Sequence, residues 1–274
     1  MSEGNELLFD VTDGIATVTI NRPEQRNAMN IAVSNGLNKI WEDIDLNPDI
    51  RVVIFTSADC GTFCAGMDLK ETAQKKAETG EDILTFMRDP FQKRMRHVRV
   101  PIIAAMTGHL MAGGMMFSLN CDMRVAMAGT KIGITESKIG RGSPWGMPLV
   151  WMLPQPVLME MVLTGDLYPI ERFHELGYIN YLEPDGDAVR ARAQELAEKI
   201  RDNAPLSVTC GKAAILAAMS ARNWPGVCIS RPIPPRMPRR ARGHLPRSAH
   251  RSGKAGKERP LGKSRDGNHR RGLR

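Results

Sequence analysis

Aromatic residues are scarce in this sequence, and it lacks a long apolar run. Phe, Trp and Tyr together make up 5% of the 274 residues. No stretch near Met1 has the length and hydrophobicity of a signal peptide, and none resembles a membrane span. We therefore expect a cytoplasmic protein with no membrane partner.

The sequence also lacks the paired cysteines of disulfide-rich or zinc-binding proteins. Its five cysteines are an odd number and form no CxxC pair, which is typical of a chain in a reducing compartment. Cys60 and Cys64 lie four positions apart, but no partnering Cys or His pair lies at ligand spacing. The sequence therefore predicts no metal site.

Positive charge is concentrated at one end of the chain. Residues 231–274 contain 15 Lys and Arg against two acids, a net charge of +13, so the total of +8 leaves −5 for residues 1–230. Arg, Pro, Gly, Ser and Lys dominate this end and cannot bury enough apolar surface to offset the entropy of ordering, which predicts a disordered basic tail over 225–274. The last 44 residues contain no aromatic side chain on which bases could stack, so we expect no nucleic-acid partner.

Upstream of the tail, apolar residues recur with the periods of strands and helices. Thr12-Asp13-Gly14 separates two β-rich runs and is typical of a hairpin turn. Wholly apolar runs predict strands that are buried on both faces, and each is followed by a Gly-rich turn, which favours an α/β domain with its site on those turns. The predicted strands are Leu7–Asp10, Ile15–Ile20, Val52–Thr56 and Ile102–Met106. The predicted helices are 31–44, 188–201 and 208–222.

The two Gly-rich turns lie at 63–70 and 108–114. Glycine lets the backbone approach a ligand closely, and a helix that begins at Gly113 would direct unpaired N–H groups at one point. Two such N–H groups can form an oxyanion hole. Either turn alone is more often a plain connection between a strand and a helix, so the interpretation depends on both turns together.

Four motifs between residues 5 and 222 occur in a characteristic order. They are Asn21-Arg22-Pro23 with Arg26-Asn27-Ala28, Phe63–Lys70, Gly108–Asp122 and Met159–Gly165. This order resembles the enoyl-CoA hydratase/isomerase (crotonase) family. The resemblance implies an α/β fold, a crotonase-like spiral of ββα repeats with C-terminal helices, and a substrate that is an acyl-CoA thioester.

The resemblance also divides the chain into three parts. It implies a crotonase-like acyl-CoA-binding domain over 1–200 and the start of a C-terminal helical oligomerisation region over 201–224. Family members form trimers or hexamers through such helices. The last of these helices are missing from this sequence, which weakens the subunit contacts expected of it. The basic tail over 225–274 does not belong to the family's fold.

The resemblance assigns catalytic roles to three positions. The backbone N–H groups of Met67 and Gly113 would hold the thioester oxygen and stabilise an enolate, and Glu136 matches one of the two glutamates that transfer protons. The other glutamate position is occupied by Met116, whose thioether cannot accept or release a proton. Glu136 taken by itself is also compatible with an exposed loop residue.

Other positions match those that line the CoA groove of the family. Arg26 is either a phosphate contact or a solvated surface charge. No separate cofactor is implied, because coenzyme A is part of the substrate. The substrate-binding candidates are Arg26, Ala28, Ala65, Met67, Asp68, Leu69, Lys70 and Gly113.

After Glu136 the sequence departs from the family, whose usual Pro-Gly reads Ser143-Pro144-Trp145 here. Large apolar side chains around this segment form either a reshaped acyl pocket or ordinary core, in which Met commonly fills gaps. They are Trp145, Trp151, Met115, Met116, Met147 and Met152. His109 lies in the second Gly-rich turn, where a core or turn role is a stronger interpretation than substrate orientation.

One acid/base beside an oxyanion hole is sufficient to isomerise the double bond of a 3-enoyl-CoA, because that reaction needs no activated water. Hydration of an enoyl-CoA is the other reaction implied, with Glu136 acting alone on water that backbone groups position. The alternative from another class of protein is a family member that binds acyl-CoA without turning it over.

Removing residues 231–274 should leave the activity of the remaining chain unchanged. A shifted reading frame in a GC-rich gene would produce the composition of this segment, because Arg, Pro and Gly codons are rich in G and C. We expect limited proteolysis to cleave it first and the trimmed protein to keep its activity. Protease resistance, or loss of activity or assembly on trimming, would show that the tail is folded into the protein.

Overall fold

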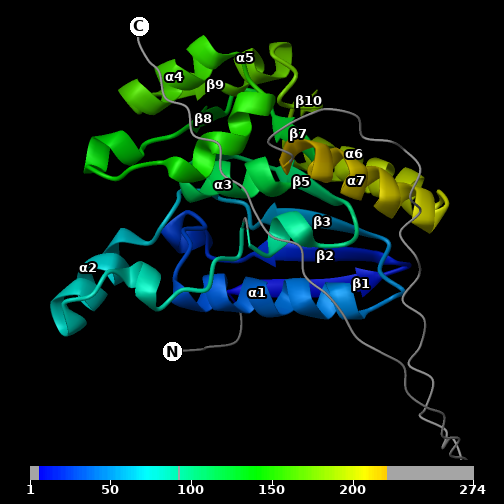
Figure 1. Ribbon diagram of the computed structural model, residues 1–274, viewed down its shortest axis with the longest axis horizontal. Coiled ribbons are helices and arrows are strands. Elements are labelled where there is room, and N and C mark those ends of the chain that lie inside the picture. The colour runs from blue at the N-terminus through cyan, green and yellow to red at the C-terminus, as the bar shows by residue number, and fades with distance from the viewer. Residues whose placement is uncertain (1–5, 92, 221–274) are drawn as a thin grey trace, which may run out of the picture. The chain divides into compact units, whose positions relative to one another are not determined.

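The computed structural model describes residues 6–91 and 93–220 (Figure 1). The chain divides into two compact units, Met1–Val227 and Cys228–Arg274. The second unit, and with it the predicted disordered tail over 225–274, lies outside the described residues. The site and the fold that supports it belong to the first unit.

The larger of two sheets has six strands in the order β1-β2-β3-β5-β7-β10. β1 and β2 form the predicted hairpin, whose turn residues Asp13 and Gly14 have φ of 50° and 74°, as a two-residue turn between antiparallel strands requires. The other neighbours pair in parallel. The strands are β1 Leu7–Thr12, β2 Ile15–Ile20, β3 Val52–Ser57, β5 Ile102–Met106, β7 Met123–Met127 and β10 Tyr181–Glu183.

The smaller sheet has the order β4-β6-β8-β9 and takes its first three strands from successive repeats. The chain passes from β3 to β4, from β5 to β6 and from β7 to β8, and each pair is followed by a helical segment. This order confirms the predicted spiral of ββα repeats. The strands are β4 Thr62–Cys64, β6 His109–Met111, β8 Lys131–Gly133 and β9 Leu167–Pro169, and the helical segments are α2 Leu69–Thr79, α3 Gly113–Asn120 and the 3-10 helix η4 Glu136–Ile139.

The remaining helices cover the sheets. The predicted helix at 31–44 is confirmed as α1, and those at 188–201 and 208–222 as α6 and α7, with α7 reaching the last described residue. The α-helices are α1 Ile31–Leu46, α4 Gln155–Thr164, α5 Ile170–Glu175, α6 Gly186–Arg201 and α7 Pro205–Ser220. The short 3-10 helices are η1 Pro23–Gln25, η2 Ile83–Thr85, η3 Met95–His97 and η5 Pro144–Trp151.

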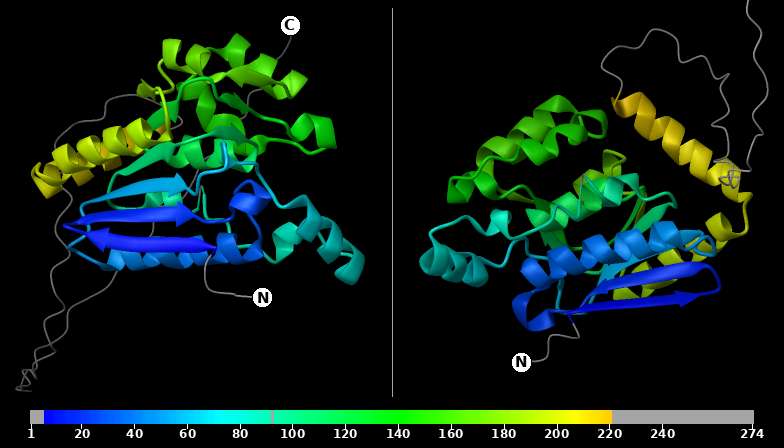
Figure 2. Two further views of the ribbon diagram at one scale, coloured as in Figure 1. Left: turned by 180° about the vertical axis from the view of Figure 1, so that it is seen from behind. Right: turned by 60° about the horizontal axis from the view of Figure 1, so that its bottom comes forward.

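The central strands β3 and β5 of the six-stranded sheet are buried on both faces, as the apolar runs predict, whereas the edge strand β1 is largely exposed. Along β3, Val52 and Ile54 pack with α6, whereas Val53 and Phe55 face the central core. The Phe55 ring lies 4.9 Å from that of Phe117 on α3. Figure 2 shows α6 and α1 on opposite sides of this sheet. Because the sheet is enclosed in this way, the turns that follow its strands are held in fixed positions.

None of the residues 205–219 of helix α7 is buried. Its attachment to the domain includes Lys212, whose Nζ lies 2.7 Å from Asp122 Oδ2 and 2.9 Å from the Val100 carbonyl oxygen. Leu206 and Ile215 on the same helix are exposed. Among residues 6–91 and 93–220, no helix has both the length and the apolar character needed to cross a membrane.

Candidate active site

The two Gly-rich turns come into backbone contact. A Cβ added to Gly113 would lie 3.2 Å from the Gly66 Cα, and one added to Gly114 would lie 2.4 Å from the Cys64 carbonyl oxygen. Pairing of β4 with β6, with Cys64 opposite Leu110, brings the turns together. Glycine is therefore required here because any side chain would push the two turns apart.

The N–H groups of Met67 and Gly113 are both available at this contact. Met29 and Met67 form a parallel β-bridge. In it, the Met29 N–H donates to the Gly66 oxygen at 2.7 Å, and the Met29 oxygen accepts from the Asp68 N–H at 2.9 Å. Because Met67 lies between these two bonding residues, its N–H points to the edge away from Met29. Gly113 is the first residue of α3, where an N–H has no acceptor within the helix. Within the described part of the chain, neither N–H donates to a backbone acceptor.

A third turn joins the first two. Ala112 N–H donates to the Gly133 oxygen at 3.1 Å, which ties the start of α3 to the end of β8. Ala112 itself has φ 48° and ψ −109°, a conformation that residues with a side chain rarely adopt. Such strain persists only where surrounding contacts fix it and is common at functional sites. Glu136 follows Gly133 by three residues along the chain, on the segment that leaves this junction.

Glu136 is buried, with 8% of its surface exposed. Its Oε1 accepts from the indole Nε1 of Trp145 at 3.1 Å, and its Oε2 is buried with no hydrogen-bond partner among the described residues. Burial raises the pKa of the Glu136 carboxyl above its usual range, and hydrogen bonds from the backbone and from Trp145 partly oppose this. The exposed-loop interpretation of this residue is therefore wrong, and one oxygen of the carboxyl is buried without a hydrogen-bond partner among the described residues.

Met116 lies one turn along α3 from Gly113, on the helix that begins at the junction. It is half-buried and packs against the central core. The side chains of α3 include no carboxylate, so the described residues offer no second acid at the family's other glutamate position. Proton transfer at this site would depend on Glu136.

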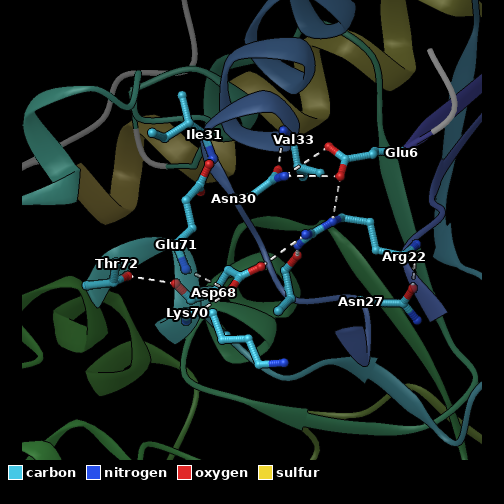
Figure 3. A network of polar contacts seen from close by, with 12 residues as sticks. Glu6, Arg22, Asn27, Asn30, Ile31, Val33, Asp68, Lys70, Glu71 and Thr72 are labelled. Atoms are coloured by element: carbon cyan, nitrogen blue, oxygen red, sulfur yellow. Dashed lines mark hydrogen bonds and ion pairs between the residues drawn. The ribbon is translucent and has the colours of Figure 1, made fainter. Parts of the chain in front are cut away.

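A buried arginine fixes the segment that leads into the first turn (Figure 3). Arg22 Nε lies 2.9 Å from Glu6 Oε1, and its Nη2 lies 3.0 Å from Asp68 Oδ2. Its Nη1 donates to the Ala28 oxygen at 2.5 Å. The guanidinium therefore joins the N-terminal segment to the residue that directly follows Met67.

The same network anchors the first turns of two helices. Asp68 Oδ1 accepts from the N–H groups of Lys70 and Glu71 at 3.1 and 3.2 Å and so caps α2. Glu71 Oε2 in turn accepts from Ile31 N–H at 2.9 Å, the first residue of α1. Since α2 contains no buried residue and extends away from the sheets (Figures 1 and 2), these polar contacts hold it at the site.

The predicted substrate-binding residues lie on this segment, but they do not all present side chains to a ligand. Arg26 is exposed, with φ 51°, and its backbone oxygen accepts from Ala65 N–H at 3.1 Å. Ala28 is buried. Both oxygens of the Asp68 carboxylate are engaged within the protein, as described above. Leu69 and Lys70 are exposed at the start of α2.

The large apolar side chains predicted as acyl pocket or core are divided by the structure. Met115 is core, and its Sδ accepts from Tyr178 Oη at 3.8 Å. Trp145 contacts Glu136. Met147 and Trp151 are exposed and line a cavity of about 510 Å³ together with Arg96, His97 and Met219. Glu136, Met67 and Gly113 do not line this cavity.

Cysteine and histidine side chains have structural surroundings. Burial raises the pKa of the Cys64 thiol to about 12, which leaves it protonated. His109 begins β6, and its Nδ1 accepts from Lys131 N–H at 2.9 Å, a contact within the fold. Among residues 6–91 and 93–220, no group of three or more His, Cys, Asp or Glu side chains is placed to hold a metal ion.

Two features of the site had no signal in the sequence. Trp145 donates to Glu136 across nine positions that include the break between η4 and η5, and Arg22 bridges two acids that are 16 and 46 positions away from it. Neither distance has a helical or strand period. Only the folded arrangement brings these groups together.

The spiral of ββα repeats, with two glycine turns in backbone contact, is that of a crotonase-type protein. The chain matches the Enoyl-CoA hydratase/isomerase family model over residues 10–228. It therefore belongs to the enoyl-CoA hydratase/isomerase family, which confirms the resemblance inferred from the four motifs.

Similar proteins share this assignment. The chain is 36% identical over 211 residues to (E)-benzylidenesuccinyl-CoA hydratase of Thauera aromatica, covering 75% of this chain and 80% of that protein. It is 34% identical over 214 residues to enoyl-CoA hydratase EchA19 of Mycobacterium tuberculosis, covering 76% and 79%. The crystal structure of an enoyl-CoA hydratase from Mycobacterium tuberculosis H37Rv superposes with a TM-score of 0.69 at 38% identity, covering 79% of this chain and 84% of that one.

Gly114→Ala should destabilise the junction, because its Cβ would lie 2.4 Å from the Cys64 carbonyl oxygen. We expect the free energy of unfolding to fall by about 2 kcal/mol in urea titrations. Gly211→Ala in α7 is the matched control, since a Cβ there meets no atom within 4 Å. It should raise the free energy of unfolding by roughly 0.5 kcal/mol. Equal behaviour of the two variants would contradict the close approach.

Proposed function

We propose that this protein is an enzyme that moves a proton at C2 of an enoyl-CoA thioester, with Glu136 as the acid/base. The observation that carries the proposal is the junction of three turns. It offers two N–H groups, those of Met67 and Gly113, next to the segment that carries a buried carboxyl, one oxygen of which has no hydrogen-bond partner among the described residues. Membership of the enoyl-CoA hydratase/isomerase family supports an acyl-CoA substrate.

The thioester oxygen would accept from the N–H groups of Met67 and Gly113. Removal of a proton from C2 places negative charge on this oxygen, and donors fixed in advance stabilise that charge without reorganising. Each such donor is typically worth about 3 to 4 kcal/mol of transition-state stabilisation. The dipole of α3 adds to the effect because Gly113 lies at its positive end.

Glu136 would take the C2 proton of a 3-enoyl-CoA and return it at C4. The electrons of the C2–H bond pass into a dienolate, and protonation at C4 leaves the double bond between C2 and C3. The Glu136 carboxyl is deprotonated again at the end of the cycle, as it was at the start. A raised pKa suits this task because the same group must release a proton as readily as it accepts one.

Isomerisation is the reaction that the residues favour. Hydration of a 2-enoyl-CoA in this family uses two glutamates, and here Met116 occupies the position of one of them. Hydration is the second candidate, because the similar proteins named above carry hydratase names. In that reaction, Glu136 alone would deprotonate the attacking water.

The CoA part of the substrate would lie along the segment from Met67 to Lys70 and across from Arg26. Arg26 and Lys70 are exposed and provide positive charge for phosphate groups. No further cofactor is required, since coenzyme A is carried by the substrate. We also propose self-association through α7, which exposes the apolar side chains of Leu206 and Ile215.

Incubation with a 2-enoyl-CoA and a 3-enoyl-CoA in separate reactions tests the proposed function. Chromatography and mass spectrometry should show conversion of the 3-enoyl to the 2-enoyl isomer with no change of mass. A product heavier by one water from the 2-enoyl-CoA would indicate hydration instead. Binding of both thioesters with no turnover would support the alternative, an acyl-CoA-binding protein without catalysis.

Glu136→Gln should abolish turnover and leave CoA-thioester affinity nearly unchanged. The amide keeps the shape of the carboxyl and loses the proton acceptor. In the unsubstituted protein, kcat/KM should rise with pH through the raised pKa of Glu136, because only the deprotonated carboxyl can take the C2 proton. Isothermal titration and a pH–rate profile measure both effects, and an active Glu136→Gln variant would refute the assignment.

Met116→Glu should increase hydration relative to isomerisation, because it restores a second carboxylate on α3. The new carboxyl would be half-buried against the core, so its ionisation must be shown by titration. The ratio of the two products from matched reactions is the measurement. A folded variant with an ionised Glu and an unchanged product ratio would contradict the role given to Met116.

A further inference from the structure

The polar contact of Trp145 with Glu136 sets this indole apart from the other apolar side chains of its segment. Its Nε1 donates to Glu136 Oε1 at 3.1 Å, and the other carboxyl oxygen, Oε2, is buried without a partner among the described residues. The two residues lie on consecutive 3-10 helices, η4 and η5. The contact therefore distinguishes the two oxygens of the carboxyl by their surroundings.

We infer that Trp145 is a positioning residue that holds Oε1 of Glu136 and leaves Oε2 as the oxygen that takes and returns the proton. This inference rests on the proposed role of Glu136 as acid/base. A carboxyl on a flexible side chain rotates about its terminal bond, and a hydrogen bond to one oxygen fixes that rotation. A fixed oxygen is most important where one carboxyl must serve both ends of the proton transfer.

The surroundings of Trp145 explain how one hydrogen bond can fix the orientation of the Glu136 carboxyl. η5 packs against α3 and carries no titratable side chain, as α3 itself carries none between Gly113 and Asn120. Met116 on α3 cannot donate a hydrogen bond to the carboxyl. Among the side chains that set the ionisation of Glu136, Trp145 is therefore the one donor, and the other contributions are burial and backbone N–H groups.

Charged groups near η4 are directed to other partners. The charged side chains of η4 and of the turn after it, Lys138 and Arg141, are paired with acids other than Glu136. Helix α4 packs against η4, and its one acid, Glu160, is also paired. On β8 and β9, Lys131 is exposed and the hydroxyl of Tyr168 contacts Thr164. The pairs are Lys138 with Asp166, Arg141 with Asp82, and Glu160 with Arg172. A change in the titration of Glu136 on substitution of Trp145 would thus report the loss of the indole donor.

Trp145→Phe tests the inference, because it keeps an aromatic ring and removes the N–H. We expect kcat to fall roughly tenfold with KM nearly unchanged, as loss of one hydrogen bond to a charged group predicts. The acidic limb of the kcat/KM profile should move to higher pH, because the donor that favours the ionised carboxyl is gone. Trp145→Gln, which restores an N–H donor, should move the limb back towards its original position.

Trp41→Phe is the matched control. It makes the same substitution at a buried indole whose Nε1 has no partner among the described residues, so it changes ring volume without removing a hydrogen bond. Thermal unfolding should shift in this variant, whereas the acidic limb should not. A merely structural Trp145 would behave in the same way as Trp41.

Titration by NMR of protein labelled with ¹³C at the glutamate carboxyl gives a readout without turnover. The Glu136 signal is assigned as the one missing from Glu136→Gln, and its midpoint should be higher in Trp145→Phe. If Trp145→Phe leaves both the Glu136 titration midpoint and the acidic limb of the kcat/KM profile unchanged, the inference is overturned, even if Glu136→Gln is inactive. Full activity of Glu136→Gln would instead refute the proposed function, so the two failures are distinguishable.

Discussion

The close approach of two backbone turns is the constraint on which the site depends. Gly66 and Gly113 meet at van der Waals distance, and the helix that follows Gly113 begins at that point. Glycine is needed at Gly114 in particular, because a Cβ there would lie 2.4 Å from the Cys64 carbonyl oxygen, a main-chain atom that repacking of side chains does not move. Both N–H groups of the proposed oxyanion hole owe their direction to this contact.

Buried polar contacts around the two glycine turns hold them in place. Arg22 joins Glu6 to Asp68, and Asp68 also caps α2, so one guanidinium supports both the turn and the helix after it. A buried ion pair is costly to break, because the remaining partner keeps its charge without compensation. At the start of α3, Ala112 has a strained backbone conformation, and the hydrogen bond from its N–H to the Gly133 oxygen maintains it. The site is thus rigid at its main chain while α2, which has no buried residue, stays at its edge.

The proposed proton transfer at this site depends on one carboxyl, that of Glu136. Burial favours the neutral form of Glu136 and raises the pKa of its carboxyl, and hydrogen bonds from the backbone and from Trp145 partly oppose this shift. With Met116 on α3, the second carboxylate of a two-glutamate site is absent from that helix. The proposed oxyanion hole with a single proposed acid/base suits the transfer of one proton between two carbons of the same substrate.

The sequence by itself determined the repeat and the elements that build it. Apolar runs placed β3 and β5 because strands enclosed on both faces need no polar residue, and Asp13-Gly14 placed the hairpin because few other residues adopt its turn conformation. The order of four motifs was specific enough to identify the family. These features are local, so neighbouring residues along the chain carry their signal.

Only the tertiary structure decided which side chains serve the site. Asp68 lies in a predicted CoA-binding motif, yet the fold uses its carboxylate to pair with Arg22 and to cap α2. Trp145 was one of several apolar residues without a distinguishing pattern, and the fold placed its N–H on Glu136, whereas Trp151 of the same segment lines a separate cavity. Contacts of this kind depend on the path of irregular chain, which has no period that a sequence could reveal.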